Sequence, residues 1–149
     1  MQRIQAASID QMDAVRVLFR EYQQSLDVDL CFQSFEEELV CLPGKYVVIL
    51  LAGEPDKFAG CVALRPLEDG IAEMKRLYVR PRYRGEGLGR ALAEAIIAEA
   101  RSRGYKALRL DTLPQMRKAI ALYRAMGFHD IEPYYLNPVC GSLFLELTL

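Results

Sequence analysis

The chain has 149 residues, of which 52% are apolar and 26% charged, and its formal net charge at pH 7 is −1. This composition is typical of a globular protein, and the length suits a single domain, 1–149, with a substantial core. A net charge near zero provides no long-range field for nucleic acid or an anionic membrane, so we expect neither as a partner.

The sequence shows no recognisable targeting signal and no metal-binding motif. The N-terminal residues contain no apolar stretch of signal-peptide length, and the longest apolar run, 46–53, is too short to span a bilayer. A cytoplasmic location is therefore expected. The four cysteines form no C-x-x-C pair and His129 is the sole histidine, so the sequence predicts no metal site and no histidine-dependent hydrolase.

In chain order, the first half predicts a strand, two helices and a three-stranded meander. Weak alternation over 3–8 indicates the strand, and apolar residues at helical spacing after Asp10, the expected N-cap, indicate a helix to residue 26. A loop leads to a second helix that Pro43 and Gly44 end. The meander is expected at 46–52, 58–67 and 71–79.

The second half alternates helices and strands. The apolar positions of 88–103 fit one face of a helix, and Gly104 stands where a helix commonly ends. The remaining elements are expected at 107–112 (strand), 114–127 (helix), 128–133 (strand) and 141–149 (strand). The order is therefore β α α β β β α β α β β. The helix 88–103 crosses over between two parallel strands in an otherwise mostly antiparallel sheet, which predicts an α/β fold with helices on both faces.

Gly85, Gly87 and Gly89 alternate at the start of the helix 88–103, although glycine is a poor helix former. The first N–H groups of a helix have no internal partner and attract phosphate, and glycine lets a ligand approach the backbone closely. Arg84 and Arg90 could each bind a phosphate oxygen. The stretch therefore predicts a pyrophosphate cradle formed by the N–H groups of residues 85–90.

Three ligand classes use such a cradle, and the spacing separates them. A Walker P-loop would place Lys and Ser or Thr after the last glycine, where this chain has Arg90 and Ala91. A Rossmann turn would require Gly or Ala at position 90 and would follow its strand directly. Asp111 could still serve as an acidic ribose ligand, so a nucleotide-dependent oxidoreductase stays an alternative that NAD(P) binding would reveal.

The third class is indicated by a resemblance. RGEGLG (84–89) resembles the [RQ]-x-x-G-x-[GA] signature of the GNAT superfamily of acyl-CoA-dependent N-acyltransferases. EMKRLYVRP (73–81) and ALYRAMGF (121–128) are similar to further elements of that family. The resemblance implies acetyl-CoA as cosubstrate, held at its pyrophosphate by a cradle comprising Arg84, Gly85, Glu86, Gly87, Leu88, Gly89 and Arg90.

The resemblance also implies catalytic roles. An amine with a pKa near 10.4 costs about 4.6 kcal/mol to deprotonate at pH 7, and Glu73 matches the family's general base, acting directly or through water. The alternative is that Glu73 only pairs with Lys75, Arg76 or Arg109, or binds the charge of the substrate. Tyr123 matches the general acid that protonates the leaving thiolate; its alternative role is core packing.

Two further regions follow from the resemblance. The strand before the cradle is expected to splay from its parallel neighbour, so that the backbones of Leu77, Tyr78 and Val79 hold the pantetheine and polarise the acetyl carbonyl. One family contact is missing, because Met116 stands where many members have an asparagine. Acceptor selection is expected in 27–35 and 133–141, with these candidate substrate residues: Asp27, Asp29, Phe32, Tyr134 and Tyr135.

The resulting hypothesis is an N-acetyltransferase that moves an acetyl group from acetyl-CoA to a primary amine of a small molecule or peptide within a ternary complex. The alternative is a non-catalytic acyl-CoA-binding module on the same fold. The sequence leaves open the identity of the amine, the length of the acyl group and the oligomeric state. A homodimer could form if the strands near 46–52 and 143–149 extended a sheet between copies.

Overall fold

The structure, a computed structural model, describes residues 2–26 and 34–149. Its element order is the predicted one, with short 3₁₀ turns added at Ile9–Gln11 and Pro81–Tyr83. The helices are α1 (Met12–Leu26), α2 (Phe35–Val40), α3 (Leu88–Ser102) and α4 (Arg117–Ala125). The strands are β1 (Ile4–Ala6), β2 (Val48–Glu54), β3 (Lys57–Glu68), β4 (Ile71–Val79), β5 (Ala107–Thr112), β6 (His129–Asp130) and β7 (Leu143–Thr148).

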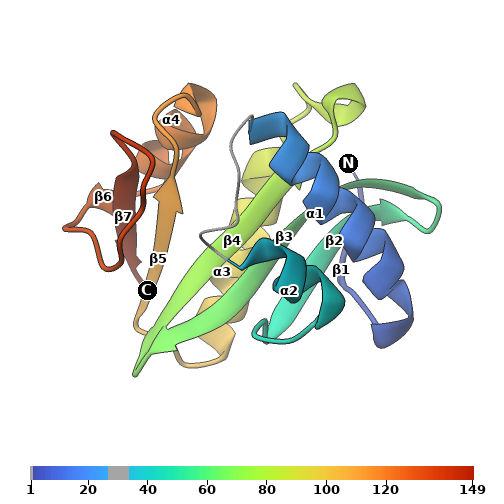
Figure 1. The fold of residues 1–149 in the computed structure, drawn as a ribbon, viewed down its shortest axis with the longest axis horizontal. Helices are drawn as coiled ribbons and strands as arrows, with labels where there is room; N and C mark the ends of the chain where they lie inside the picture. Colours follow the sequence, from blue (N-terminus) through green and yellow to red (C-terminus); the bar gives the residue numbers. More distant parts are fainter. Residues whose placement is uncertain (1, 27–33) are drawn as a thin grey trace.

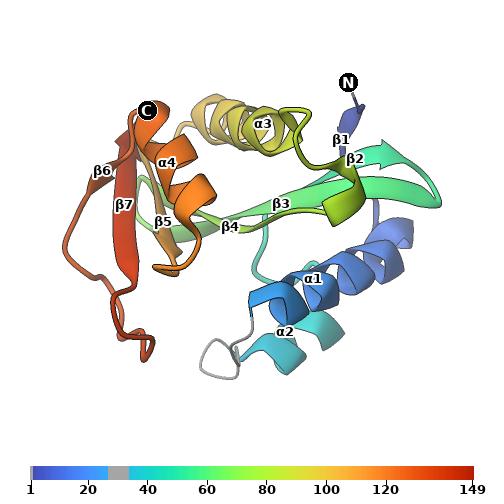
Figure 2. The same ribbon diagram turned by 90° about the horizontal axis from the view of Figure 1, so that it is seen from above.

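The strands form one seven-stranded sheet in the order β1-β2-β3-β4-β5-β7-β6. Only β4 and β5 are parallel, and α3 connects them, as the crossover pattern predicted. Figure 2 shows α1 and α2 on one face of the sheet and α3 and α4 on the other. The predicted mixed α/β fold is therefore confirmed.

A separate apolar core lies on each face of the sheet. The α1 residues Val15, Leu18 and Phe19 are buried against one face together with α2, and Leu92 and Ile96 of α3 are buried against the other. Apolar side chains of β3 contribute to both cores, because successive side chains of a strand point to opposite faces of the sheet. The apolar periodicity read from the sequence thus corresponds to real contacts.

The sheet opens between β4 and β5. Their pairing covers only three residue pairs and ends at Glu73 opposite Arg109. Beyond that point β4 is distorted, since its register with β3 shifts and Arg76 has a φ of +60°, which is unusual for a residue other than glycine. Figure 1 shows the two strands diverging. The expected splay is present, and the distortion lies within β4 itself.

Some local predictions were wrong. The turn before α1 is capped by Ser8, whose N–H donates to Gln11, so Asp10 is not the N-cap. α4 begins at Arg117 and not at Pro114, because the residues before it form a separate turn closed by the Met116 N–H. In the described part of the chain, no helix has the length and apolarity to cross a membrane.

The two strands proposed for sheet extension both lie inside the sheet. β2 pairs with β1 and β3, so it offers no edge to another copy and that expectation was wrong. β7 pairs with β5 along its length, but β6 covers only Leu145 and Glu146 on its other side. A propensity pattern shows that a segment is a strand, but its place in the sheet depends on long-range pairing.

Candidate active site

The glycine stretch forms an open cradle between β4 and α3. Gly85 and Gly87 have φ of +86° and +80°, which L side chains rarely adopt, and a Cβ at either position would meet no atom within 4 Å. None of the N–H groups of residues 85–90 donates to a backbone acceptor in the described chain. Unpaired N–H groups beside open space fit a pyrophosphate.

The two arginines that flank the cradle are both held by local contacts. Arg84 Nε donates to the Val79 carbonyl at 2.9 Å, and Arg90 Nε donates to Glu94 at 2.8 Å. The Arg90 pair is more than half exposed, so separating it costs little. Both guanidinium groups therefore lie beside the cradle and can be redirected toward an anion.

An opening occupies the split between β4 and β5, and residues of both strands line it. Tyr123 lies in its wall, where its ring packs on Phe128 at 5.7 Å between centroids. Burial raises the pKa of the Tyr123 hydroxyl, so the group keeps its proton at neutral pH. Tyr123 can therefore pack its ring in the core and still line the opening.

Tyr22 of α1 lies in the wall of the same opening. Burial raises its pKa to about 12, although the charge of Arg76 opposes the shift. The sequence analysis did not identify this residue, because helical spacing cannot show that the end of the apolar face of α1 meets a cavity. Tyr22 is therefore a second buried hydroxyl beside Tyr123.

The strand residues expected to hold the pantetheine differ in their placement. Leu77 lines the opening, whereas Tyr78 turns its side chain toward α1 and contacts Glu21 at 3.3 Å through its hydroxyl. Val79 packs partly buried with the α3 core, and its carbonyl accepts from Arg84. The roles predicted for these three residues concern their backbones and stay predictions.

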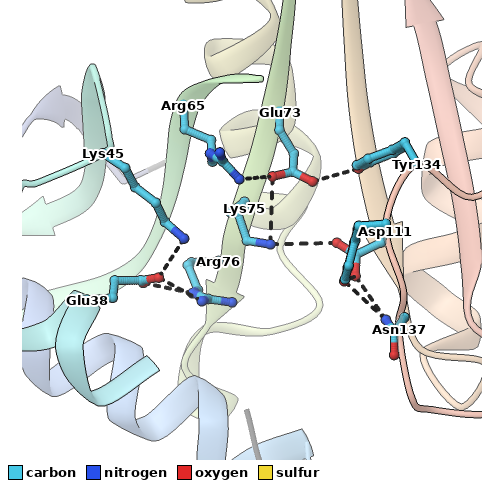
Figure 3. A network of polar contacts seen from close by, with 10 residues as sticks. Glu38, Lys45, Arg65, Glu73, Lys75, Arg76, Asp111, Tyr134 and Asn137 are labelled. Carbon is cyan, nitrogen blue, oxygen red and sulfur yellow. Dashed lines mark hydrogen bonds and ion pairs between the residues drawn. The ribbon is translucent and has the colours of Figure 1, made fainter. Parts of the chain in front are cut away.

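Glu73 is 1% exposed and lies at the centre of a polar network (Figure 3). Its Oε1 is 3.2 Å from Arg65 Nη1 and 3.8 Å from Lys75 Nζ, while its Oε2 accepts from the Tyr134 hydroxyl at 2.6 Å. Of the pairing partners considered from sequence, Lys75 lies within ion-pair distance, whereas Arg76 pairs with Glu38 and Arg109 pairs with Glu68 and Glu146. A buried carboxylate with charged and hydroxyl donors is well held.

Lys75 bridges Glu73 and Asp111 (Figure 3). Its Nζ is 3.7 Å from Asp111 Oδ1, and the side chain is 6% exposed. Burial lowers the pKa of Lys75, while the two carboxylates work against that shift. Asp111 also accepts from the hydroxyl of Tyr135 and from Asn137 at 3.2 Å. The carboxylate considered as a ribose ligand is thus held within the protein.

A second opening shares Lys75 with the first, is also lined by Glu73, and is hereafter called the acceptor opening. Tyr134 and Tyr135, predicted as substrate residues, line it from the segment between β6 and β7. The other predicted substrate residues, Asp27, Asp29 and Phe32, lie outside the described residues. The acceptor opening is lined by Lys45, Arg65, Leu67, Glu73, Lys75, Tyr134 and Tyr135.

Sequence reasoning missed the basic residues of the acceptor opening. Arg65 and Lys45 lie on β3 and just before β2, respectively, and no local motif marks either. An available signal was the strand pattern itself, because Arg65 follows a fully apolar run and then faces Glu73 across the β3–β4 pair. Such cross-strand pairs are readable once the hairpin register is known.

Another buried ion pair fixes the position of α2 against β4. Arg76 donates to both oxygens of Glu38 at 2.9 and 3.0 Å, and Lys45 lies 3.1 Å from the same carboxylate. Burial alone would raise the pKa of Glu38, but the hydrogen bonds and charge of Arg76, with the charge of Lys45, hold it below its ordinary value.

Comparisons with known proteins agree with this geometry. Residues 12–128 match the acetyltransferase (GNAT) family. The chain is 38% identical over 144 residues to an uncharacterized N-acetyltransferase of Schizosaccharomyces pombe, covering 93% of this chain and 88% of that protein. Its fold is similar to that of a GNAT-family acetyltransferase from Staphylococcus aureus (TM-score 0.81, 18% identity, 99% of both chains). It is also similar to that of a Salmonella typhimurium protein solved with acetyl-CoA (TM-score 0.72, 20% identity, 99% and 94% covered).

Proposed function

Because the chain belongs to the acetyltransferase (GNAT) family, we propose that it transfers an acetyl group from acetyl-CoA to a primary amine, directly and within a ternary complex. The observation that carries this proposal is that an open cradle at residues 85–90 follows β4, and that β4 and β5 separate around an opening that shares Lys75 with a second opening. One opening suits the thioester arm and the other the amine, so the two substrates would meet in the split between β4 and β5.

Acetyl-CoA supplies an activated acyl group and a thiolate leaving group. The N–H groups of residues 85–90 would hold its pyrophosphate, with Arg84 and Arg90 as charged neighbours. The unpaired edge of β4 beyond Glu73 provides the backbone groups of Leu77, Tyr78 and Val79 for the pantetheine and for the developing oxyanion. Glu86, Leu88 and Gly89 complete the cradle.

Glu73 and Tyr123 perform the proton transfers in this proposal. Glu73 accepts the proton of the amine directly or through water, and its contacts with Arg65 and Tyr134 hold it in position. Tyr123 carries its proton at neutral pH because burial raises its pKa, so it can donate to the leaving thiolate. Both groups line an opening, but not the same one.

The direct route is supported by where the cysteines lie. Cys61 is completely buried with its pKa raised by burial, and no described cysteine lines either opening. A covalent acyl-enzyme would need an accessible thiolate. In a steady-state experiment that varies acetyl-CoA and amine together, direct transfer gives intersecting reciprocal plots. Parallel lines would contradict the ternary complex.

The alternative is a non-catalytic acyl-CoA-binding module. The decisive experiment measures thiol release from acetyl-CoA with a panel of small-molecule and peptide amines, in wild type and Glu73→Gln. Enzymatic function predicts amine-dependent release that falls about 100-fold or more in the variant. Tight acetyl-CoA binding without turnover of any amine would favour the binding module.

A further inference from the structure

The acceptor opening is dominated by positive charge. It contains three basic side chains and one acidic one, Glu73, among its lining residues. Both oxygens of Glu73 already have partners, because Oε1 contacts Arg65 and Lys75 and Oε2 accepts from Tyr134. The surplus of positive charge in this opening therefore favours an acceptor that carries an anionic group in addition to its amine.

Arg65 has donor capacity left over. Its Nη1 donates to Glu73 at 3.2 Å, but its Nε is completely buried and has no acceptor in the described part of the protein. The Arg65 side chain is 29% exposed and lines the acceptor opening, so its guanidinium group is within reach of a ligand there. A guanidinium group that presents more than one N–H matches the geometry of a carboxylate.

Lys45 adds a second cation that can reach into the opening. Its Nζ is 3.1 Å from Glu38, and its side chain is 35% exposed, so the pair is not sealed from a ligand. Glu38 keeps Arg76 as its main partner when Lys45 turns away. Arg65 and Lys45 thus form a basic wall of the acceptor opening, with Glu73 directly beside it.

We propose that the acceptor is an α-amino acid whose carboxylate binds Arg65 and Lys45 while its amine faces Glu73. The inference rests on the acetyltransferase function proposed above. An α-amine and its carboxylate are separated by one carbon, and Arg65 Nη1 and Glu73 Oε1 are neighbours at 3.2 Å, so the two ends of the ligand match two adjacent groups. Leu67, Tyr134 and Tyr135 provide apolar surface for the side chain.

The experiment compares amino acids with their amides, which share the side chain but lack the carboxylate charge. Initial rates of thiol release are measured for phenylalanine and phenylalaninamide, for leucine and leucinamide, and for a polyamine. Losing the carboxylate lowers the pKa of the neighbouring amine, so intrinsic reactivity near neutral pH favours the amide. We expect the free acids to have at least about tenfold higher kcat/KM, since a charged hydrogen bond contributes at that scale.

The variant Arg65→Gln separates binding of the carboxylate from catalysis. If the variant disturbs Glu73 and slows the chemical step, kcat/KM falls for the acid and the amide alike. If it removes carboxylate binding, kcat/KM falls for the acid alone, and the ratio of the two kcat/KM values approaches one. Arg65→Lys should recover part of the ratio, because it restores the charge. Lys57→Gln, an exposed lysine on β3 away from both openings, is the matched control and should leave the ratio unchanged.

The outcomes are distinguishable. Turnover of amides or polyamines at rates equal to or above those of the acids would overturn this inference and leave the acetyltransferase function intact. An acid preference that Arg65→Gln does not change would also overturn it. If no amine of any class is turned over, the proposed function fails, and the acceptor assignment fails with it.

Discussion

The hydroxyl oxygen of Tyr123 distinguishes its proposed catalytic role from its packing role. The substitution Tyr123→Phe removes only the hydroxyl and leaves the ring against Phe128. We expect kcat to fall about 100-fold, as for loss of a general acid, with a small change in the thermal unfolding midpoint. Steady-state kinetics and thermal unfolding of the variant provide both measurements.

Tyr22→Phe is the matched control, because its hydroxyl is buried at the same opening. A larger loss of kcat in Tyr22→Phe than in Tyr123→Phe would assign the acid role to the helix α1 residue. Since burial raises the pKa of both hydroxyls above 10, neither should cause activity to decline with pH below about pH 10.

Single residues also show which parts of the site could be read from sequence. Glu73 stood out as a charged residue in an apolar strand, and the structure places it buried at the acceptor opening. Tyr134 was one of several candidates, and its hydrogen bond to Glu73 spans 61 positions of the chain. Arg65 was not recognised, because its significance depends on its register with Glu73.

At the scale of elements, the cradle between β4 and α3 requires backbone conformations that favour glycine. We expect Gly87→Val to cost about 1–2 kcal/mol of stability, because φ is +80° there, and to weaken coenzyme A binding by placing side-chain atoms in the cradle. The dissociation constant of coenzyme A and the free energy of unfolding can be measured separately by calorimetry and urea denaturation.

Gly104→Val provides the control for backbone strain. Gly104 has a φ of +85° and open space around it, at the opposite end of α3. It should therefore show a similar loss of stability with unchanged coenzyme A binding. Equal weakening of binding in both variants would mean that the effect at Gly87 comes from destabilised α3 and not from the cradle.

The contact between α2 and β4 depends on the Glu38–Arg76 pair. We expect Glu38→Gln to cost about 3 kcal/mol at pH 7, since a buried charge loses its carboxylate partner. Glu36→Gln on the same helix, in an exposed pair with Arg20, should cost less than about 1 kcal/mol. Urea denaturation at pH 7 compares the two.

The pH dependence of this pair has a defined sign. The native pKa of Glu38 lies below its ordinary value, so the unfolded chain binds a proton first as pH falls. The stability difference between wild type and Glu38→Gln is therefore fully present above about pH 4.5 and shrinks as pH falls through the native pKa. A difference that stays constant down to pH 3 would contradict this assignment.

For the whole molecule, coenzyme binding should appear as added stability. At a concentration of about 100 times Kd, acetyl-CoA is expected to stabilise the fold by about 2.7 kcal/mol, which for a chain of this size raises the unfolding midpoint by about 5–10 °C. NAD(P)H should give no shift. A shift with NAD(P)H and none with CoA compounds would instead favour the nucleotide-dependent alternative.

The element order, the crossover connection and the position of the cradle were determined by the sequence alone. These features depend on interactions between near neighbours: helical spacing in α1 and α3, alternation in β3, and glycines at the start of a helix. Errors occurred where local signals compete, as at the Ser8 cap and at Pro114, which begins a turn before α4.

Only the tertiary structure decided which residues share the site. The split between β4 and β5, the register that places Arg65 beside Glu73, and the return of the segment with Tyr134 and Tyr135 all depend on contacts between distant positions. The sign of charge in the acceptor opening follows from these contacts. Periodicity along a chain describes one element at a time, whereas the charge presented to a substrate is a sum over elements that meet only in the folded protein.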